Sequence, residues 1–171
     1  PVSVIYSGDT IVEREAWGTP TLARAWIASV NRLRETYWRG DYYWLLLTSG
    51  FRTYRFLPVF WREFHPRFDS SVPACRKRLL DHLALERFGR QYDSATGIVR
   101  FAQPQRLRGK LSAIPPGRAI DPHVAFFLSC NPGHRNGDEL VCLTELSPGN
   151  LTAAGRRMAR PRLHESHHGQ R

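Results

Sequence analysis

Hydrophobic side chains in the first third of the chain alternate between strand-like runs and one helical stripe. Residues 2–12 are rich in β-branched and aromatic side chains around a glycine interruption, which predicts a bulged strand. Residues 20–37 carry a Pro start and apolar side chains at helical spacing, which predicts a helix. Residues 42–48 form a continuous apolar run that is typical of a buried central strand. This order predicts a βαβ unit.

Helical and strand patterns continue through the rest of the chain. Aromatic side chains recur on one face of residues 51–64, where Pro58 predicts a kink or two short helices. Residues 73–89 predict a third helix, with Cys75 among its inward-facing side chains. Further strands are predicted at residues 98–102, 123–130 and 140–146.

Together these patterns define the expected architecture. We expect an α/β fold with a mixed sheet, a βαβ unit in the first third and three main helices. Residues 1–146 would form one domain, in which residues 65–146 add a helix and a β-rich remainder to the unit of residues 1–64. Residues 147–171 are rich in Gly, Ala and Arg and predict a loosely ordered basic tail.

The net positive charge of the chain is compatible with an anionic partner but does not identify one. The 171 residues include 25 Lys and Arg against 15 Asp and Glu, which gives a net charge of +10, and Lys77 and Lys110 are the only lysines. Arginine grips phosphate and carboxylate groups with paired hydrogen bonds, but a coding bias would produce the same composition. The spread of the arginines along the chain favours coding bias. Anionic ligands, nucleotides included, should still be attracted.

Other features bear on where the protein works. The longest apolar run, residues 42–47, is far shorter than the ~20 residues of a membrane helix, and no signal-peptide pattern is present. Three cysteines do not suggest a disulfide scaffold, so we expect a cytoplasmic protein that binds no membrane. No Cys or His spacing matches a standard zinc site, and we expect no metal. The start at Pro1 indicates either processing or a piece of a longer protein.

A candidate ligand site lies in the connection between the first strand and the first helix. The start of a helix offers unpaired backbone N–H groups and the positive end of its dipole, which suits a pyrophosphate. An ordinary strand-to-helix connection would look the same. The candidate residues are Arg14, Trp17, Gly18, Thr19 and Thr21.

Candidate catalytic groups follow the apolar strand and occur near the later turn-rich loop. The hydroxyl of Tyr54 could protonate a leaving thiolate, although the spacing of this residue also suits a packed core tyrosine. Glu13 could receive an amine, and so could Asp138 or its neighbour Glu139. The sequence around the last two is also that of a plain turn.

The order of strand, Gly-containing loop, long helix, apolar strand, Gly and Tyr-bearing helix resembles the second half of the acyl-CoA N-acyltransferase fold, the GNAT superfamily. The resemblance covers residues 2–64. In that family a Gln/Arg-x-x-Gly-x-Gly/Ala pattern holds the coenzyme A pyrophosphate through its backbone amides. Gly18 matches the first glycine, Arg14 stands near the basic position, and Pro20 replaces the second small residue. Tyr54 occupies the place of the family's thiolate-protonating tyrosine.

The resemblance implies an enzyme that transfers an acyl group from acetyl-CoA, or another acyl-CoA, to a small-molecule amine. It also implies that the front half of the fold is missing from the chain and would come from a partner domain. Two other classes stay open. One is a non-catalytic basic module that binds an anionic partner such as nucleic acid, and the other is a fragment that completes a larger enzyme.

Overall fold

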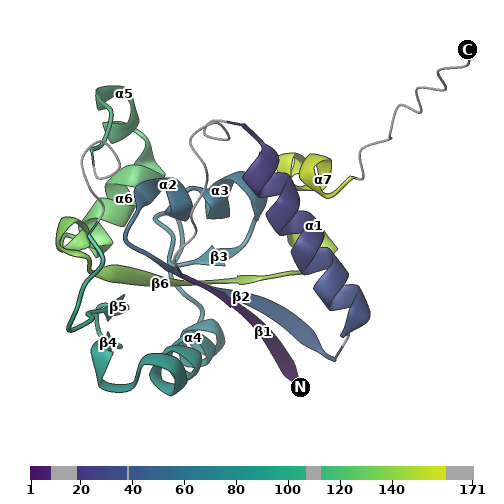
Figure 1. Cartoon of the computed structure of the whole chain (residues 1–171), viewed down its shortest axis with the longest axis horizontal. Coiled ribbons are helices and arrows are strands. Elements are labelled where there is room, and N and C mark those ends of the chain that lie inside the picture. The colour runs from purple at the N-terminus through teal and green to yellow at the C-terminus, as the bar shows by residue number, and fades with distance from the viewer. Residues whose placement is uncertain (9–18, 38, 107–112, 161–171) are drawn as a thin grey trace, which may run out of the picture.

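The first two strands and the long helix form the parallel unit that the sequence predicts. Strand β1 (Val2–Ser7) pairs in parallel with strand β2 (Asp41–Thr48), and helix α1 (Thr21–Thr36) lies between them in the chain (Figure 1). The strand predicted over residues 2–12 is confirmed as far as Ser7. The computed structural model describes residues 1–8, 19–37, 39–106 and 113–160.

Strand β6 (Glu139–Glu145) lies at the centre of the sheet. It pairs antiparallel with β2 on one side. On its other side it pairs with β5 (Ile98–Val99) at its start and with β3 (Phe64–His65) near its end. Strand β4 (Tyr92–Asp93) extends the sheet beyond β5, so that the strand order is β1-β2-β6-β5-β4 with β3 beside β6. The predicted α/β class with a mixed sheet is therefore confirmed.

Helices cover both faces of this sheet (Figure 1). Helix α4 (Ala74–Phe88) covers one face. The other face carries α1 together with α2 (Phe51–Tyr54), α3 (Phe56–Phe60), α6 (Pro122–Cys130) and α7 (Ala153–Ala159). Shorter turns are α5 (Pro116–Ala119) and the 3₁₀ helices Gly89–Gln91, His134–Asn136 and Pro148–Asn150. Within the described ranges, no helix has both the length and the apolar character to cross a membrane.

Alternating side chains of β2 build two hydrophobic cores. Trp44 and Leu46 belong to the core under α1, α2, α3 and α6. Leu45 and Leu47 belong to the core under α4. Because β2 is buried on both faces, its sequence is continuously apolar rather than alternating.

Two of the predicted helices have the expected bounds. Pro58 lies in α3, which a single residue separates from α2, so the two short helices are confirmed. Helix α4 begins after Pro73 and ends before Gly89, as predicted. Leu80 and Phe88 are buried on its inward face as expected, together with Ala84, but Cys75 is exposed, so its predicted inward position is wrong.

The strand predicted over residues 123–130 is a helix, α6. Asp121 caps it by accepting a hydrogen bond from the backbone N–H of His123 at 3.0 Å, and Pro122 occupies its first turn. A short apolar run has no period that separates a buried strand from a buried helix. The Asp-Pro start was the signal that decides between them.

The predicted loose tail over residues 147–171 is also corrected in its first part. Helix α7 lies there, and Thr152 caps it by accepting a hydrogen bond from Gly155 N–H at 3.0 Å. A Cβ at Gly155 would lie 2.4 Å from the Phe60 carbonyl oxygen, so this glycine lets α7 pack closely on α3. Residues 161–171 lie outside the described residues.

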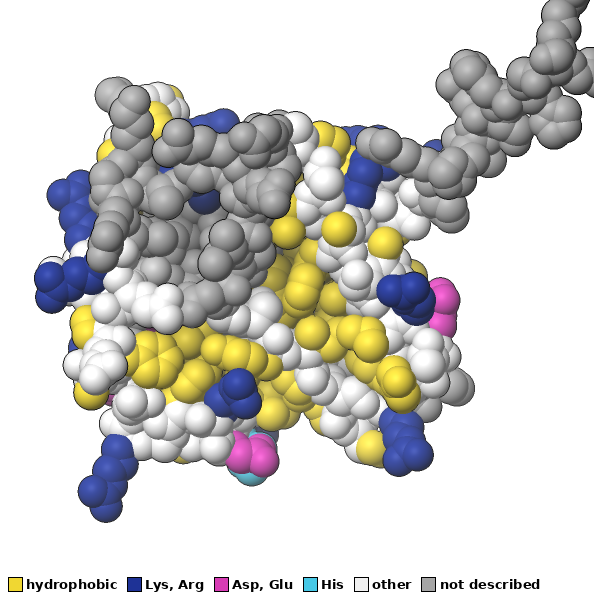
Figure 2. Space-filling model, viewed as in Figure 1, with side chains coloured by type: hydrophobic (Ala, Val, Ile, Leu, Met, Phe, Trp, Pro, Cys, Tyr) yellow, Lys and Arg dark blue, Asp and Glu magenta, His cyan; other side chains and the backbone are white. Residues whose placement is uncertain are grey.

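The edge of the described sheet is β1, and one side of this strand exposes apolar side chains. Val2 is 49% exposed and Val4 is 37% exposed. Figure 2 shows apolar side chains spread across the middle of the molecular face in view, with lysine and arginine side chains scattered around them. Helix α4 therefore covers its face of the sheet only in part.

Candidate functional site

Tyr54, the predicted proton donor, lies in the core between α2 and α6. It is 0% exposed, and its hydroxyl donates a hydrogen bond to the Pro66 carbonyl oxygen at 2.9 Å. Its ring packs on Phe127 with the ring centroids 5.5 Å apart. Burial raises the pKa of Tyr54, because the phenolate would lose its hydration. These surroundings are those of a packed core tyrosine, which is the alternative that its spacing allowed.

Asp138, a predicted amine anchor, is engaged by an arginine. Arg100 Nε lies 3.2 Å from Asp138 Oδ2, and Arg100 Nη1 lies 3.6 Å from an Asp93 oxygen. A Cβ at Gly133 would lie 2.2 Å from the same Asp138 oxygen, so the glycine makes room for this carboxylate. Asp138 therefore closes its own loop onto the β4–β5 hairpin.

The predicted pyrophosphate loop is described only at its end. Glu13, Arg14, Trp17 and Gly18 lie outside the described residues. Thr19 and Thr21 are exposed at the start of α1. Their hydroxyls lie 3.0 Å apart, and the Thr21 N–H donates to Thr19 Oγ1 at 3.3 Å. The structure thus places two predicted cofactor residues together at the beginning of a helix.

A small cavity lies beyond the carboxyl ends of β1 and β2, beside the start of β6. Its volume is about 160 Å³. In open α/β sheets, ligands bind outside the carboxyl ends of the parallel strands. The residues that line this strand-end cavity are Tyr6, Gly8, Leu47, Phe101, Gln103, Gln105 and Glu139.

Glu139 contributes a buried carboxylate to the strand-end cavity. The residue is 7% exposed and begins β6, where it pairs with Val99. Successive side chains of a strand point to opposite faces, so Glu139 lines the cavity while Asp138 meets Arg100. The sequence indicated both acids of this loop, and the register of β6 separates their roles.

Tyr6 brings a phenol to the same cavity. A Cβ at Gly8 would lie 2.6 Å from the Tyr6 hydroxyl oxygen, so the glycine allows this hydroxyl to approach the backbone. The guanidinium carbon of Arg87 lies 4.0 Å from the centroid of the Tyr6 ring, and the Phe88 ring contacts its edge. The sequence alone does not single out Tyr6, because an aromatic side chain in a strand pattern usually belongs to the core.

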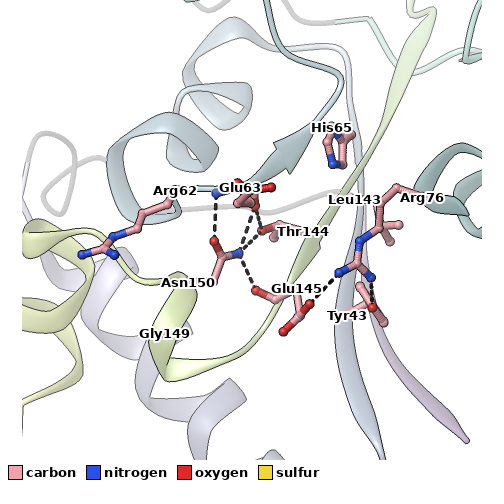
Figure 3. Close-up of a pocket in the computed structure, with 10 residues that line it drawn as sticks. All are labelled: Tyr43, Arg62, Glu63, His65, Arg76, Leu143, Thr144, Glu145, Gly149 and Asn150. Atoms are coloured by element: carbon pink, nitrogen blue, oxygen red, sulfur yellow. Dashed lines mark hydrogen bonds and ion pairs between the residues drawn. The ribbon is translucent and has the colours of Figure 1, made fainter. Parts of the chain in front are cut away.

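A larger pocket of about 430 Å³ lies at the opposite end of β2 and β6 (Figure 3). No pattern in the sequence predicts this pocket, because its residues come from segments that are far apart in the chain and follow no local motif. The residues that line this polar pocket are Tyr43, Arg62, Glu63, His65, Arg76, Leu143, Thr144, Glu145, Gly149 and Asn150.

Asn150 fixes the wall of the polar pocket. Its Oδ1 accepts a hydrogen bond from the Glu63 N–H at 2.8 Å. Its amide nitrogen donates to the carbonyl oxygens of Glu63 and Glu145, at 2.9 and 2.8 Å. The Thr144 hydroxyl donates to the same Glu63 carbonyl at 2.7 Å. These bonds lock the two-residue strand β3 onto the end of β6.

Arg76 connects α4 to the same end of β6. Its Nη2 lies 2.8 Å from Glu145 Oε2, and its Nη1 donates to the Tyr43 hydroxyl (Figure 3). Burial raises the pKa of Tyr43, although the charge of Arg76 opposes the rise. Tyr43 therefore stays protonated at neutral pH, and the Arg76 charge is balanced by Glu145.

His65 is an uncharged, buried imidazole in the pocket wall. It is 6% exposed, and its Nδ1 has no hydrogen-bond partner among the described residues. Burial lowers the pKa of His65 below the ordinary value of about 6.5, and the neighbouring Glu63 carboxylate opposes this shift. The ring is therefore neutral at physiological pH.

Comparisons with known proteins do not assign the chain to a family. No protein-family model, no curated protein and no solved structure matches it. Within the described residues, no group of three or more His, Cys, Asp or Glu could hold a metal ion. A function can therefore be argued from the two cavities and from the order of the elements.

Proposed function

We propose that the protein transfers an acyl group from an acyl-CoA to an amine in the strand-end cavity. The observation that carries this proposal is the buried Glu139 carboxylate beyond the carboxyl ends of two parallel strands. The order β1, α1, β2, Gly50 and α2, which resembles the GNAT fold, supports the same reaction class.

Glu139 would receive the amine. Most amines are protonated at neutral pH, and only the neutral amine attacks a carbonyl carbon. A buried carboxylate attracts the ammonium form. It takes one proton from the ammonium group and passes it to water, which leaves a neutral amine beside an ionised Glu139 before the attack. Asp138 is unsuited to this role, because Arg100 already occupies its carboxylate.

Tyr6 would serve the departing thiolate. The amine nitrogen attacks the thioester carbonyl carbon, the C–N bond forms and the C–S bond breaks. The amine proton passes to Glu139, and the coenzyme A thiolate takes the Tyr6 phenol proton; exchange with water then restores both groups. Tyr54 would have a positioning role, since its hydroxyl holds the Pro66 carbonyl.

The start of α1 would hold the pyrophosphate of the acyl-CoA. Backbone N–H groups in the first turn of a helix suit an anion, and at this end of α1 the Thr21 N–H donates to Thr19 Oγ1. The hydroxyls of Thr19 and Thr21 stand at the same place. Arg14, Trp17 and Gly18 would complete the site from the preceding loop.

Calorimetric titration with acetyl-CoA, at low and high salt, tests the proposal. We expect saturable binding that survives high salt, because oriented backbone donors are screened less than surface arginines. The Thr21→Ala variant alters a residue of the proposed pyrophosphate site and should weaken binding modestly. Failure to saturate at millimolar acetyl-CoA, or binding that disappears at high salt, would overturn the proposal.

A further inference from the structure

We propose that the polar pocket of Figure 3 binds a small molecule through a primary ammonium group, held between Glu63 and His65. The pocket lies at the other end of β6 from the strand-end cavity, so the inference is independent of the proposed acyl transfer. Its volume of about 430 Å³ is within the range of small-molecule sites.

Most polar groups of the pocket are already occupied by one another. The side chains of Asn150 and Thr144 are hydrogen-bonded to the backbone of Glu63 and Glu145. Arg76 is held by Glu145 and Tyr43. These groups build a rigid wall rather than offering hydrogen bonds to a ligand. The side chains left for a ligand are those of Glu63 and His65.

Glu63 presents an uncommitted carboxylate. Its backbone N–H and C=O belong to the Asn150 network, which fixes the position of the residue. Its carboxylate makes no hydrogen bond or ion pair with the described residues. It lies two positions from His65, and both residues line the pocket. Two steps along an extended chain separate Cα atoms by about 7 Å. An ammonium group can reach across that span.

The charge inside the pocket favours a cation. Arg76 and Glu145 neutralise each other, and His65 is neutral because burial lowers its pKa. Figure 3 shows the Arg62 guanidinium directed away from the other pocket side chains. Arg67 also acts electrostatically on Glu63, but its guanidinium is paired with the Asp69 carboxylate. Glu63 is therefore the pocket carboxylate without an ion pair among the described residues, and the other walls are hydrogen-bonded or apolar.

His65 gives the site its preference for a primary ammonium over a cation without N–H groups. Its Nδ1 is buried, so the ring nitrogen that remains for a ligand is Nε2, which accepts a hydrogen bond when the proton is on Nδ1. An ammonium N–H can donate to this nitrogen while another donates to Glu63. A quaternary ammonium ion offers no such donor.

An NMR titration of the full ¹⁵N-labelled chain with propylamine hydrochloride at neutral pH tests the inference. We expect saturable shifts of the backbone amide signals of Glu63, His65 and Glu145. 1-Propanol and tetramethylammonium chloride, at equal concentration and ionic strength, should give no saturable shifts there. Glu63→Gln should weaken binding about tenfold or more, since it removes the charged acceptor.

Glu35→Gln is the matched control, because it makes the same change at an exposed residue of α1 that does not line the pocket. It should leave the affinity within about twofold, and lowering the pH until His65 becomes protonated should weaken binding. Equal affinity in Glu63→Gln and in the unaltered chain would overturn the inference. So would saturation by tetramethylammonium, the absence of saturable propylamine shifts, or shifts confined to the Glu139 end of β6. Glu63 is exposed, so its variant should fold.

Discussion

The two ends of strand β6 carry the same residue type in opposite circumstances. Glu139 begins the strand, is 7% exposed, and lines the small cavity beyond the parallel strands. Glu145 ends the strand with a side chain that is 33% exposed, and Arg76 neutralises it. The first carboxylate is enclosed at the place where ligands of α/β sheets bind, and the second is a structural part of a wall.

This difference shows that the role of an acidic side chain is set by its partners. At the start of β6, Asp138 pairs with Arg100, and the neighbouring Glu139 lines the strand-end cavity. At the end of β6, Glu145 forms an ion pair with Arg76, and the Glu63 carboxylate contributes a negative charge to the polar pocket. In both places one acid completes the structure through an ion pair, and another lines a cavity.

The largest effect should come from Glu139→Gln. If this carboxylate accepts the amine proton, its loss should lower kcat/KM for acyl transfer by about 10²–10⁴-fold. Thiol release from acetyl-CoA in the presence of a panel of primary amines measures the rate. Asp138→Asn is the matched control, because it alters the neighbouring acid, and it should keep the rate within a few fold. Equal losses in the two variants would remove the distinction between them.

Asn150→Ala should produce the largest loss of stability at the other end of β6. It removes an amide that bonds Glu63, Thr144 and Glu145, and it leaves buried backbone groups unsatisfied. We expect a decrease of about 2–4 kcal/mol in the free energy of unfolding. Urea denaturation measures it, and the exposed Asn136→Ala variant should change it by less than about 0.5 kcal/mol.

Substitution of Tyr54 and of Tyr6 should distinguish a structural tyrosine from a catalytic one. Tyr54→Phe removes a buried hydrogen bond and should cost about 1 kcal/mol of unfolding free energy without lowering turnover. Tyr6→Phe should lower turnover and have a smaller effect on stability. Denaturation and thiol-release assays on both variants check this. Lower turnover in folded Tyr54→Phe, with no change in Tyr6→Phe, would reverse the assignment.

The smallest effect is a pH dependence of stability. Burial lowers the pKa of His65, His123 and His134 in the folded chain, so the unfolded chain binds their protons more readily. The stability that these neutral histidines contribute is fully present above their ordinary pKa of about 6.5 and decreases as the pH falls below that value. Each histidine contributes at most about 1.4 kcal/mol per pH unit. Unfolding that is insensitive to pH between neutral and mildly acidic conditions would contradict this.

Local chemistry predicted most of the scaffold. The hydrophobic run of β2, the helical stripe of α1 and the proline in α3 each carry a signal within a few residues, and the structure has these elements. The apolar run of α6 has no diagnostic period and predicts a strand, although the Asp121-Pro122 start distinguishes the helix.

The candidate sites depended on contacts that no local pattern contains. The polar pocket joins Tyr43, His65, Arg76 and Asn150, which are brought together by the pairing of β2, β3 and β6. The sequence indicated acids near residue 139, but the choice between Asp138 and Glu139 required the strand register. Residue types could therefore suggest chemistry, while tertiary pairing decided which groups face a cavity.

An NMR titration of the ¹⁵N-labelled chain with acetyl-CoA at high salt tests the central claim most directly. That claim is that the strand-end cavity, and not the polar pocket, receives the acyl donor. We expect saturable shifts of the backbone amide signals of Tyr6, Leu47 and Glu139, with those of Glu63 and His65 unchanged. Shifts centred on Glu63 and His65, or no saturable shifts at either end of β6, would contradict the account.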